Sequence, residues 1–98
     1  MANYISLLQW TEQGVKDYAS SAERVGQAKQ AIEKLGGKLG HIYWTLGQYD
    51  VVAILEFPND ETATAFALKL SALGNVRSTT MRAFDEAEFK AIVAKAKA

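Results

Sequence analysis

The segment that most constrains the fold is Val51 to Phe57, which is apolar throughout except for Glu56. A strand with water on one face alternates apolar and polar residues, whereas a continuous apolar run is typical of a central strand covered on both faces. The tight connection Gly47 to Asp50 precedes the run and Pro58 ends it. The chain is therefore expected to build a sheet with this segment in its interior.

Three further segments have strand character. Tyr4 to Trp10 is rich in strand-favouring residues, and Asn75 to Phe84 is more polar, as suits an edge strand. Lys38 to Leu46 alternates with the period of a strand. This alternation predicts one face made of Leu39, His41, Tyr43 and Thr45.

Helical patterns lie between these strands. Ser20 and Glu23 have the spacing of a capping box and precede apolar residues at helical intervals, and Gly36 follows the last of them. A second helix is expected to begin after Asn59 or Asp60 and to end before Gly74. Its apolar stripe consists of Ala63, Phe66, Ala67, Leu70 and Leu73.

The resulting order is strand, helix, strand, strand, helix, strand, with an added C-terminal helix capped by Asp85 and Glu88. This is the ferredoxin-like α+β arrangement, with an antiparallel sheet and both helices on one face because each crossover is right-handed. The other face is left bare, although Ile5 to Leu8 and Val51 to Leu55 offer apolar residues to both sides. We expect residues 1–98 to form one domain that pairs with an identical copy through the open sheet face.

Composition excludes several classes of protein. The 98 residues carry 11 basic and 11 acidic side chains, so no positive field attracts nucleic acid or an anionic membrane. The chain has no cysteine and one histidine, which gives no expectation of a metal site or of another cofactor. No leader pattern or bilayer-length apolar run is present, so a cytoplasmic protein is expected.

Three separated segments carry a family resemblance: Tyr4 to Gly14, Gly47 to Asp50, and Leu73 to Thr80 followed by Arg82 to Phe84. Together they resemble the GYD domain family. The resemblance implies the dimeric α/β barrel superfamily, in which two ferredoxin-like sheets lie face to face. That superfamily includes cofactor-independent monooxygenases, isomerases, haem-dependent enzymes and amino-acid-sensing domains, so the resemblance implies no single activity.

His41 and Tyr43 are the candidate catalytic pair, because residues two apart on a strand project from the same face. A histidine there could act as general base while the phenol hydrogen-bonds a carbonyl or enolate oxygen. The same spacing also suits an amphipathic pair that fills a wet interface between sheets.

Aromatic and basic residues are the candidate ligand-binding groups. Trp10, Trp44 and Tyr49 could line a pocket for an aromatic or quinone-like ligand, or serve only as core. Arg77 and Arg82 have opposite parity on the last strand, so only one points into a shared interior, where it could bind a carboxylate. Surface ion pairs are the structural alternative for both.

Three functions follow from these patterns. The leading hypothesis is a homodimer that binds a small apolar or aromatic ligand. The second is a cofactor-independent monooxygenase or isomerase that acts on an aromatic or quinone-like substrate, with His41 as base. The third is a structural module that assembles into higher oligomers through the edge strand Val76 to Phe84.

Overall fold

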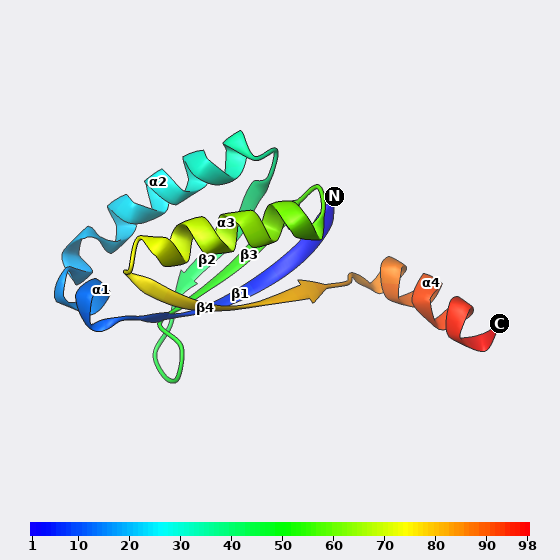
Figure 1. Ribbon diagram of the computed structural model, residues 1–98. Helices are drawn as coiled ribbons and strands as arrows, with labels where there is room; N and C mark the ends of the chain where they lie inside the picture. The colour runs from blue at the N-terminus through cyan, green and yellow to red at the C-terminus, as the bar shows by residue number, and fades with distance from the viewer.

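The computed structural model describes residues 1–98 and contains one antiparallel sheet in the order β2-β3-β1-β4 (Figure 1). The strands are β1 (Ala2–Trp10), β2 (Lys38–Trp44), β3 (Val51–Phe57) and β4 (Val76–Ala83). The apolar strand β3 lies between β2 and β1, and the more polar β4 is an edge strand. Both placements confirm the predictions from residue pattern.

Two long helices cover one face of this sheet, and no helix covers the other (Figure 1). The helical elements are α1 (Glu12–Lys16), the 3₁₀ turn η1 (Tyr18–Ser20), α2 (Ser21–Lys34), α3 (Asp60–Ala72) and α4 (Glu86–Lys97). The covering helices are α2 and α3, whereas α4 leads away from the sheet beyond β4. The fold is therefore α+β and ferredoxin-like, with an additional C-terminal helix, as predicted. No helix combines the length and the apolar character that crossing a bilayer requires.

The helix starts were predicted with mixed success. Asn59 caps α3 by accepting the amide of Thr62 at 2.9 Å, and Asp85 forms the expected reciprocal capping box with Glu88. The capping box predicted at Ser20 is wrong. The Ser20 hydroxyl donates instead to Asp17 at 2.9 Å, because the η1 turn runs directly into α2 and leaves no extended capping residue.

The core lies between the sheet and the two covering helices. Phe57 is its centre, with the ring of Tyr4 packed edge-on at 6.0 Å and the ring of Phe66 at 5.6 Å. Alternate residues of β3 are buried and the residues between them are half-buried. The buried apolar set is Tyr4, Leu8, Ile32, Val51, Ala53, Leu55, Phe57, Ala63 and Phe66.

The predicted alternation along β2 is wrong at its start. Leu39 is paired with Leu55 and packs on the helix side, whereas His41 is paired with Ile54, and the register shifts between them. The extra residue is Gly40, where an added Cβ would lie 3.2 Å from the Ile54 carbonyl oxygen. Between these two pairs β2 advances by two residues while β3 advances by one, which is a β-bulge, so Leu39 and His41 face opposite sides of the sheet.

The uncovered side of the sheet is called here the open face. Register places Ile5 of β1 between Ile54 and Met81, and Leu7 between Val52 and Thr79. Its residues include Ile5, Leu7, His41, Tyr43, Val52, Ile54, Arg77, Thr79 and Met81. The centre of this face is aliphatic, and polar groups lie on the outer strands and near the strand ends, as at Asn3, Gln9 and Glu56.

Candidate functional site

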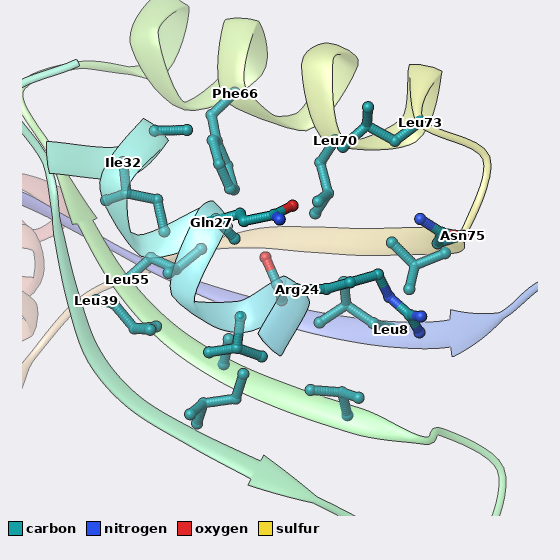
Figure 2. Close-up of a pocket in the computed structure, with 18 of the residues that line it drawn as sticks. Leu8, Arg24, Gln27, Ile32, Leu39, Leu55, Phe66, Leu70, Leu73 and Asn75 are labelled. Carbon is teal, nitrogen blue, oxygen red and sulfur yellow. The ribbon is translucent and has the colours of Figure 1, made fainter. Parts of the chain in front are cut away.

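A cavity of about 390 Å³ lies between the sheet and helices α2 and α3 (Figure 2). Its floor is apolar, because the helix-facing residues of β1 and β3 meet apolar side chains from both helices. Phe66 and Leu70 point into it from α3, and Ile32 lines it from α2. The buried floor residues include Leu8, Val51, Ala53 and Leu55.

Apart from two serines, the polar residues that line the cavity are Arg24, Gln27, Lys69 and Asn75, which are called here the mouth. Gln27 and Lys69 are exposed, whereas Arg24 and Asn75 are half-buried. The mouth thus combines two cations with two carboxamides above an apolar floor. No acidic residue lines the cavity.

Arg24 is held in place by the segment that precedes α2. Its guanidinium donates to the carbonyl oxygen of Asp17 at 2.8 Å and to that of Gly14 at 3.4 Å. The Asp17 carboxylate lies 3.5 Å from the same guanidinium. These contacts fix the direction of the Arg24 side chain, so its position at the mouth is preorganised.

The neighbouring wall of the cavity depends on close packing of α1 against the loop after α3. Gly14 approaches Asn75 so closely that an added Cβ would lie 1.9 Å from the Asn75 carbonyl oxygen. The same oxygen accepts the amide of Thr11 at 3.1 Å, and the Asn75 side-chain oxygen accepts from Gln13 at 3.0 Å. Gly14 therefore brings Arg24 and Asn75 to the same end of the cavity.

Of the three predicted aromatic ligand residues, one lines the cavity and two do not. Trp10 lines the cavity. Trp44 lies on the helix side but outside the lining, where its indole N–H donates to the hydroxyl of Ser21 at 2.9 Å. Tyr49 is half-buried in the β2–β3 connection, also outside the lining, and its carbonyl oxygen accepts the Thr45 hydroxyl at 2.6 Å.

The two predicted arginines face opposite sides of the sheet, as their parity indicates. Arg77 is exposed on the open face, opposite Gln9. Arg82 lies on the helix side, where its guanidinium packs 4.5 Å from the ring centroid of Phe84. Neither arginine lines the cavity.

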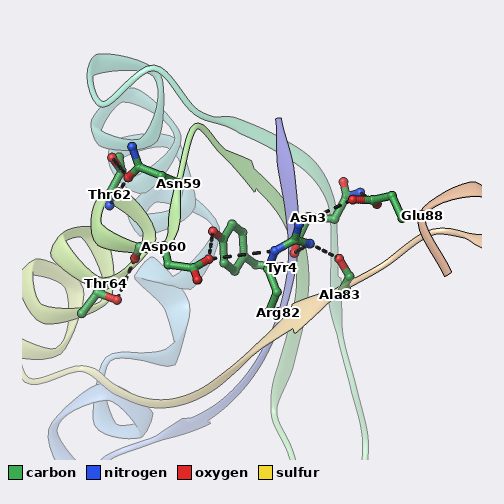
Figure 3. Close-up of polar contacts among 9 residues, drawn as sticks. All are labelled: Asn3, Tyr4, Asn59, Asp60, Thr62, Thr64, Arg82, Ala83 and Glu88. Atoms are coloured by element: carbon green, nitrogen blue, oxygen red, sulfur yellow. Dashed lines mark hydrogen bonds and ion pairs between the residues drawn. The ribbon is translucent and has the colours of Figure 1, made fainter. Parts of the chain in front are cut away.

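Arg82 belongs to a polar network at the far end of β1 (Figure 3). Its guanidinium lies 3.9 Å from Asp60 and 3.5 Å from Glu88, and it donates to the carbonyl oxygens of Asn3 and Ala83. The network therefore joins β1, α3 and the start of α4. Arg82 therefore ties together three elements that are far apart in the sequence.

Tyr4 and Glu88 have shifted acidities in this network. Burial raises the pKa of Tyr4 to about 12, and the hydrogen bond of its hydroxyl to Asp60 at 2.6 Å adds to the effect. The pKa of Glu88 is lowered, first by the hydrogen bond from the Asp85 amide at 3.0 Å and then by Arg82. Both shifts follow from burial and from hydrogen bonds within the network.

His41 and Tyr43 lie together on the open face and not at the cavity. Their rings are stacked, with centroids 6.3 Å apart and planes at 10°. Both side chains are exposed in the single chain. An enclosed space around His41 would therefore have to be completed by another chain.

The family model described as GYD domain matches residues 4–93. The chain belongs to the GYD domain family. The match covers β1 from Tyr4 onwards, the other three strands, the covering helices and most of α4.

This GYD domain is similar to a protein of Thermus thermophilus named glutamine synthetase and cystathionine beta-lyase binding protein. The two are 28% identical over 89 residues, which cover 90% of this chain and 94% of the relative. Its fold is similar to the crystal structure of TTHA0845, also from Thermus thermophilus, with a TM-score of 0.56 and 23% identity. That alignment covers 87% of this chain and 95% of the other.

The polar mouth of this GYD domain was missed at the level of sequence, although a signal existed. Arg24, Ala28 and Ile32 are spaced four apart and lie on one side of α2. Lys69 follows Phe66 by three residues and lies on the same side of α3. Basic residues in phase with the apolar stripes of both helices mark an opening above the core.

The sequence gives no equivalent signal for a metal site, and no group of three or more potential metal ligands is present.

Proposed function

We propose that this GYD domain binds a small, largely apolar ligand in the cavity beneath α2 and α3. The cavity itself carries this proposal: its volume of about 390 Å³ lies within the rough range of 300–1,000 Å³ of small-molecule sites. Its apolar floor with a few polar groups at the opening is also typical of such sites. Trp10 gives the floor a flat aromatic surface suited to a ring-containing ligand.

A thermal-shift screen of aromatic and quinone-like compounds tests this function. A ligand that binds only the folded state raises the melting temperature by mass action. The variant Ala28→Phe fills the cavity from α2, because Ala28 lines it. Ala22→Phe is the matched control on the same helix, since Ala22 is exposed and outside the lining.

The expected result is a raised melting temperature in the wild type and in Ala22→Phe, and little or no ligand effect in Ala28→Phe. Equal ligand effects in all three proteins would place binding outside the cavity and contradict the proposal. A screen in which no compound shifts the wild type would contradict it as well.

We further propose that residues 1–98 act as one domain that forms a homodimer through the open face. Ile5, Leu7, Val52 and Ile54 form a contiguous aliphatic centre there, and a twofold axis makes one such surface complementary to itself. Sedimentation equilibrium tests the proposal with Ile54→Lys, which places a charge at that centre. A monomeric wild type, or an Ile54→Lys variant that stays dimeric, would contradict it.

Protein binding is a second proposed function, favoured by the name of the Thermus relative, which is that of a binding protein for two enzymes. Helix α4 is the surface that a dimer through the open face leaves unassigned. Phe89, Ile92 and Val93 are exposed on it. Affinity capture with the wild type and with Phe89→Glu tests this function: a specific partner should be lost with the variant, and equal recovery would exclude α4 as the contact.

Catalysis by His41 and Tyr43 is a hypothesis that depends on the dimer. A general base needs an enclosed space in which it meets the substrate, and both side chains are exposed in the single chain. The stacked arrangement of the two rings favours a shared role at the dimer contact. His41→Ala separates the roles: a lost dimer with ligand binding retained indicates an interface residue.

A further inference from the structure

We propose that the ligand of the cavity is an amphipathic monocarboxylic acid, with its carboxylate held by Arg24 and Lys69 and its apolar body on the cavity floor. This inference rests on the proposed binding function and names the class of ligand. It follows from the charge at the mouth, the hydrogen-bond donors that remain free there and the apolar interior.

The charged residues that line the cavity have one sign. Arg24 and Lys69 are basic, and no aspartate or glutamate lines the cavity. Asp17 offsets part of the Arg24 charge from outside at 3.5 Å, but its own side chain is 65% exposed and hydrated. Lys69 forms no ion pair. The mouth therefore retains about one uncompensated positive charge, which matches a monoanion better than a neutral ligand or a dianion.

Hydrogen-bond donors remain available at the same place. A guanidinium has five N–H groups, and two of its nitrogens use one bond each to the carbonyl oxygens of Asp17 and Gly14. The Asn75 side-chain oxygen is engaged by Gln13, while its NH₂ group donates to no protein acceptor. Arg24 and Asn75 thus present fixed, unused donors, and a carboxylate accepts from several donors at once.

The geometry also separates the two ends of the ligand. The mouth residues come from α2, α3 and the loop after α3, whereas Leu8 and Leu55 line the cavity from strands β1 and β3 of the sheet (Figure 2). Apolar atoms gain by leaving water and a carboxylate loses by doing so. A ligand with one charged end and an apolar body satisfies both regions, whereas a neutral quinone leaves the cations without a partner.

Isothermal titration calorimetry with matched probes tests the inference on the full chain. The probes are 2-naphthoate and decanoate, their uncharged primary amides, and 2-naphthyl phosphate as the dianion. At pH 7.5 both acids are ionised, since carboxyl groups titrate near pH 4. We expect each acid to bind at least tenfold more tightly than its amide and 2-naphthoate to bind more tightly than the phosphate.

Variants identify the groups responsible. Lys69→Met should reduce the preference for acid over amide about three- to tenfold while leaving amide affinity nearly unchanged. Lys29→Met is the matched control, because Lys29 is an exposed lysine on α2 outside the lining. Arg24→Gln keeps a hydrogen-bond donor but removes the charge, so it should independently reduce the preference for acid over amide. Circular dichroism verifies that each variant is folded.

These outcomes distinguish the carboxylate inference from the proposed ligand-binding function on which it rests. Equal affinity for acids and amides, tighter binding of the phosphate, or an unchanged preference in both Lys69→Met and Arg24→Gln would overturn the carboxylate inference and leave ligand binding intact. Absence of binding by all probes and by the compounds of the thermal-shift screen would overturn the proposed function itself.

Discussion

Replacing Gly14 by alanine should strongly destabilise this GYD domain, because it separates α1 from the loop after α3. An added Cβ at Gly14 would lie 1.9 Å from the Asn75 carbonyl oxygen, whereas real Cβ atoms essentially never come closer than 3.0 Å. The obstacle is rigid backbone, so the two segments must move apart by about 1 Å. That movement also stretches the hydrogen bond from the Thr11 amide to Asn75, now 3.1 Å.

The expected cost is about 3 kcal/mol, from overpacking of roughly 1–3 kcal/mol and a weakened hydrogen bond worth about 1 kcal/mol. For a domain of this size, such a loss lowers the melting temperature by more than roughly 10 °C. Urea unfolding followed by tryptophan fluorescence measures the free energy of unfolding directly. Because Asn75 forms part of the mouth, Gly14→Ala should also weaken ligand binding.

Gly26→Ala is the matched control. Gly26 lies in α2, and an added Cβ there meets nothing within 4 Å. Alanine should therefore stabilise the domain by about 0.5–1 kcal/mol through its helix preference. Equal effects of the two substitutions, or a cost below about 1 kcal/mol for Gly14→Ala, would refute the close packing at Asn75.

Three other predictions concern the polar network and the open face. The pKa of Tyr4 is raised to about 12, so the stability that its hydroxyl contributes is complete below pH 10 and is lost as pH rises from 10 to 12. The variant Tyr4→Phe should remove this alkaline loss of stability in urea melts recorded at a series of pH values. The pKa of Glu88 is lowered from 4.5, so the stability that its carboxylate contributes is present above pH 4.5 and is lost as pH falls through the lowered pKa. The variant Glu88→Gln should reduce the dependence of stability on pH in that acid range. An unchanged dependence on pH would contradict the network. Ile54→Lys should convert the proposed dimer to a monomer in sedimentation equilibrium while the melting profile stays cooperative, and an unfolded variant would show instead that Ile54 is needed within the single chain.

Much of the fold was predictable because its signals are local. The apolar run of β3, the caps at Asn59 and Asp85 and the helical spacing of α2 and α3 each depend on a few neighbouring residues. Handedness then places both helices on one side of the sheet. The strand order β2-β3-β1-β4 follows from those rules.

The errors in the predicted strands and caps arise where a longer-range arrangement overrides a local pattern. The bulge at Gly40 reverses the phase of β2, and alternation alone gives no sign of it. The capping-box spacing at Ser20 is present in the sequence, but the η1 turn occupies the place where an extended capping residue would stand. Residue propensities alone reveal neither the bulge at Gly40 nor the η1 turn before α2.

The candidate site was harder to predict than the fold, because a cavity depends on how far two helices stand above a sheet. Trp10 was selected for its aromatic ring and does line the cavity. Arg24 and Lys69 were overlooked because charged residues on helices usually face solvent. Their spacing in phase with the apolar stripes was a signal, but the packed arrangement is needed to show that both line one cavity.

Solution NMR measures most directly whether the cavity is the binding site. Titration of ¹⁵N-labelled protein with 2-naphthoate should shift the indole N–H signal of Trp10 and the backbone amides of Leu8, Ala28 and Leu70, which line the cavity. The amides of exposed open-face residues such as Tyr43 should stay in place. Shifts confined to the open face, with the Trp10 indole unchanged, would contradict the account.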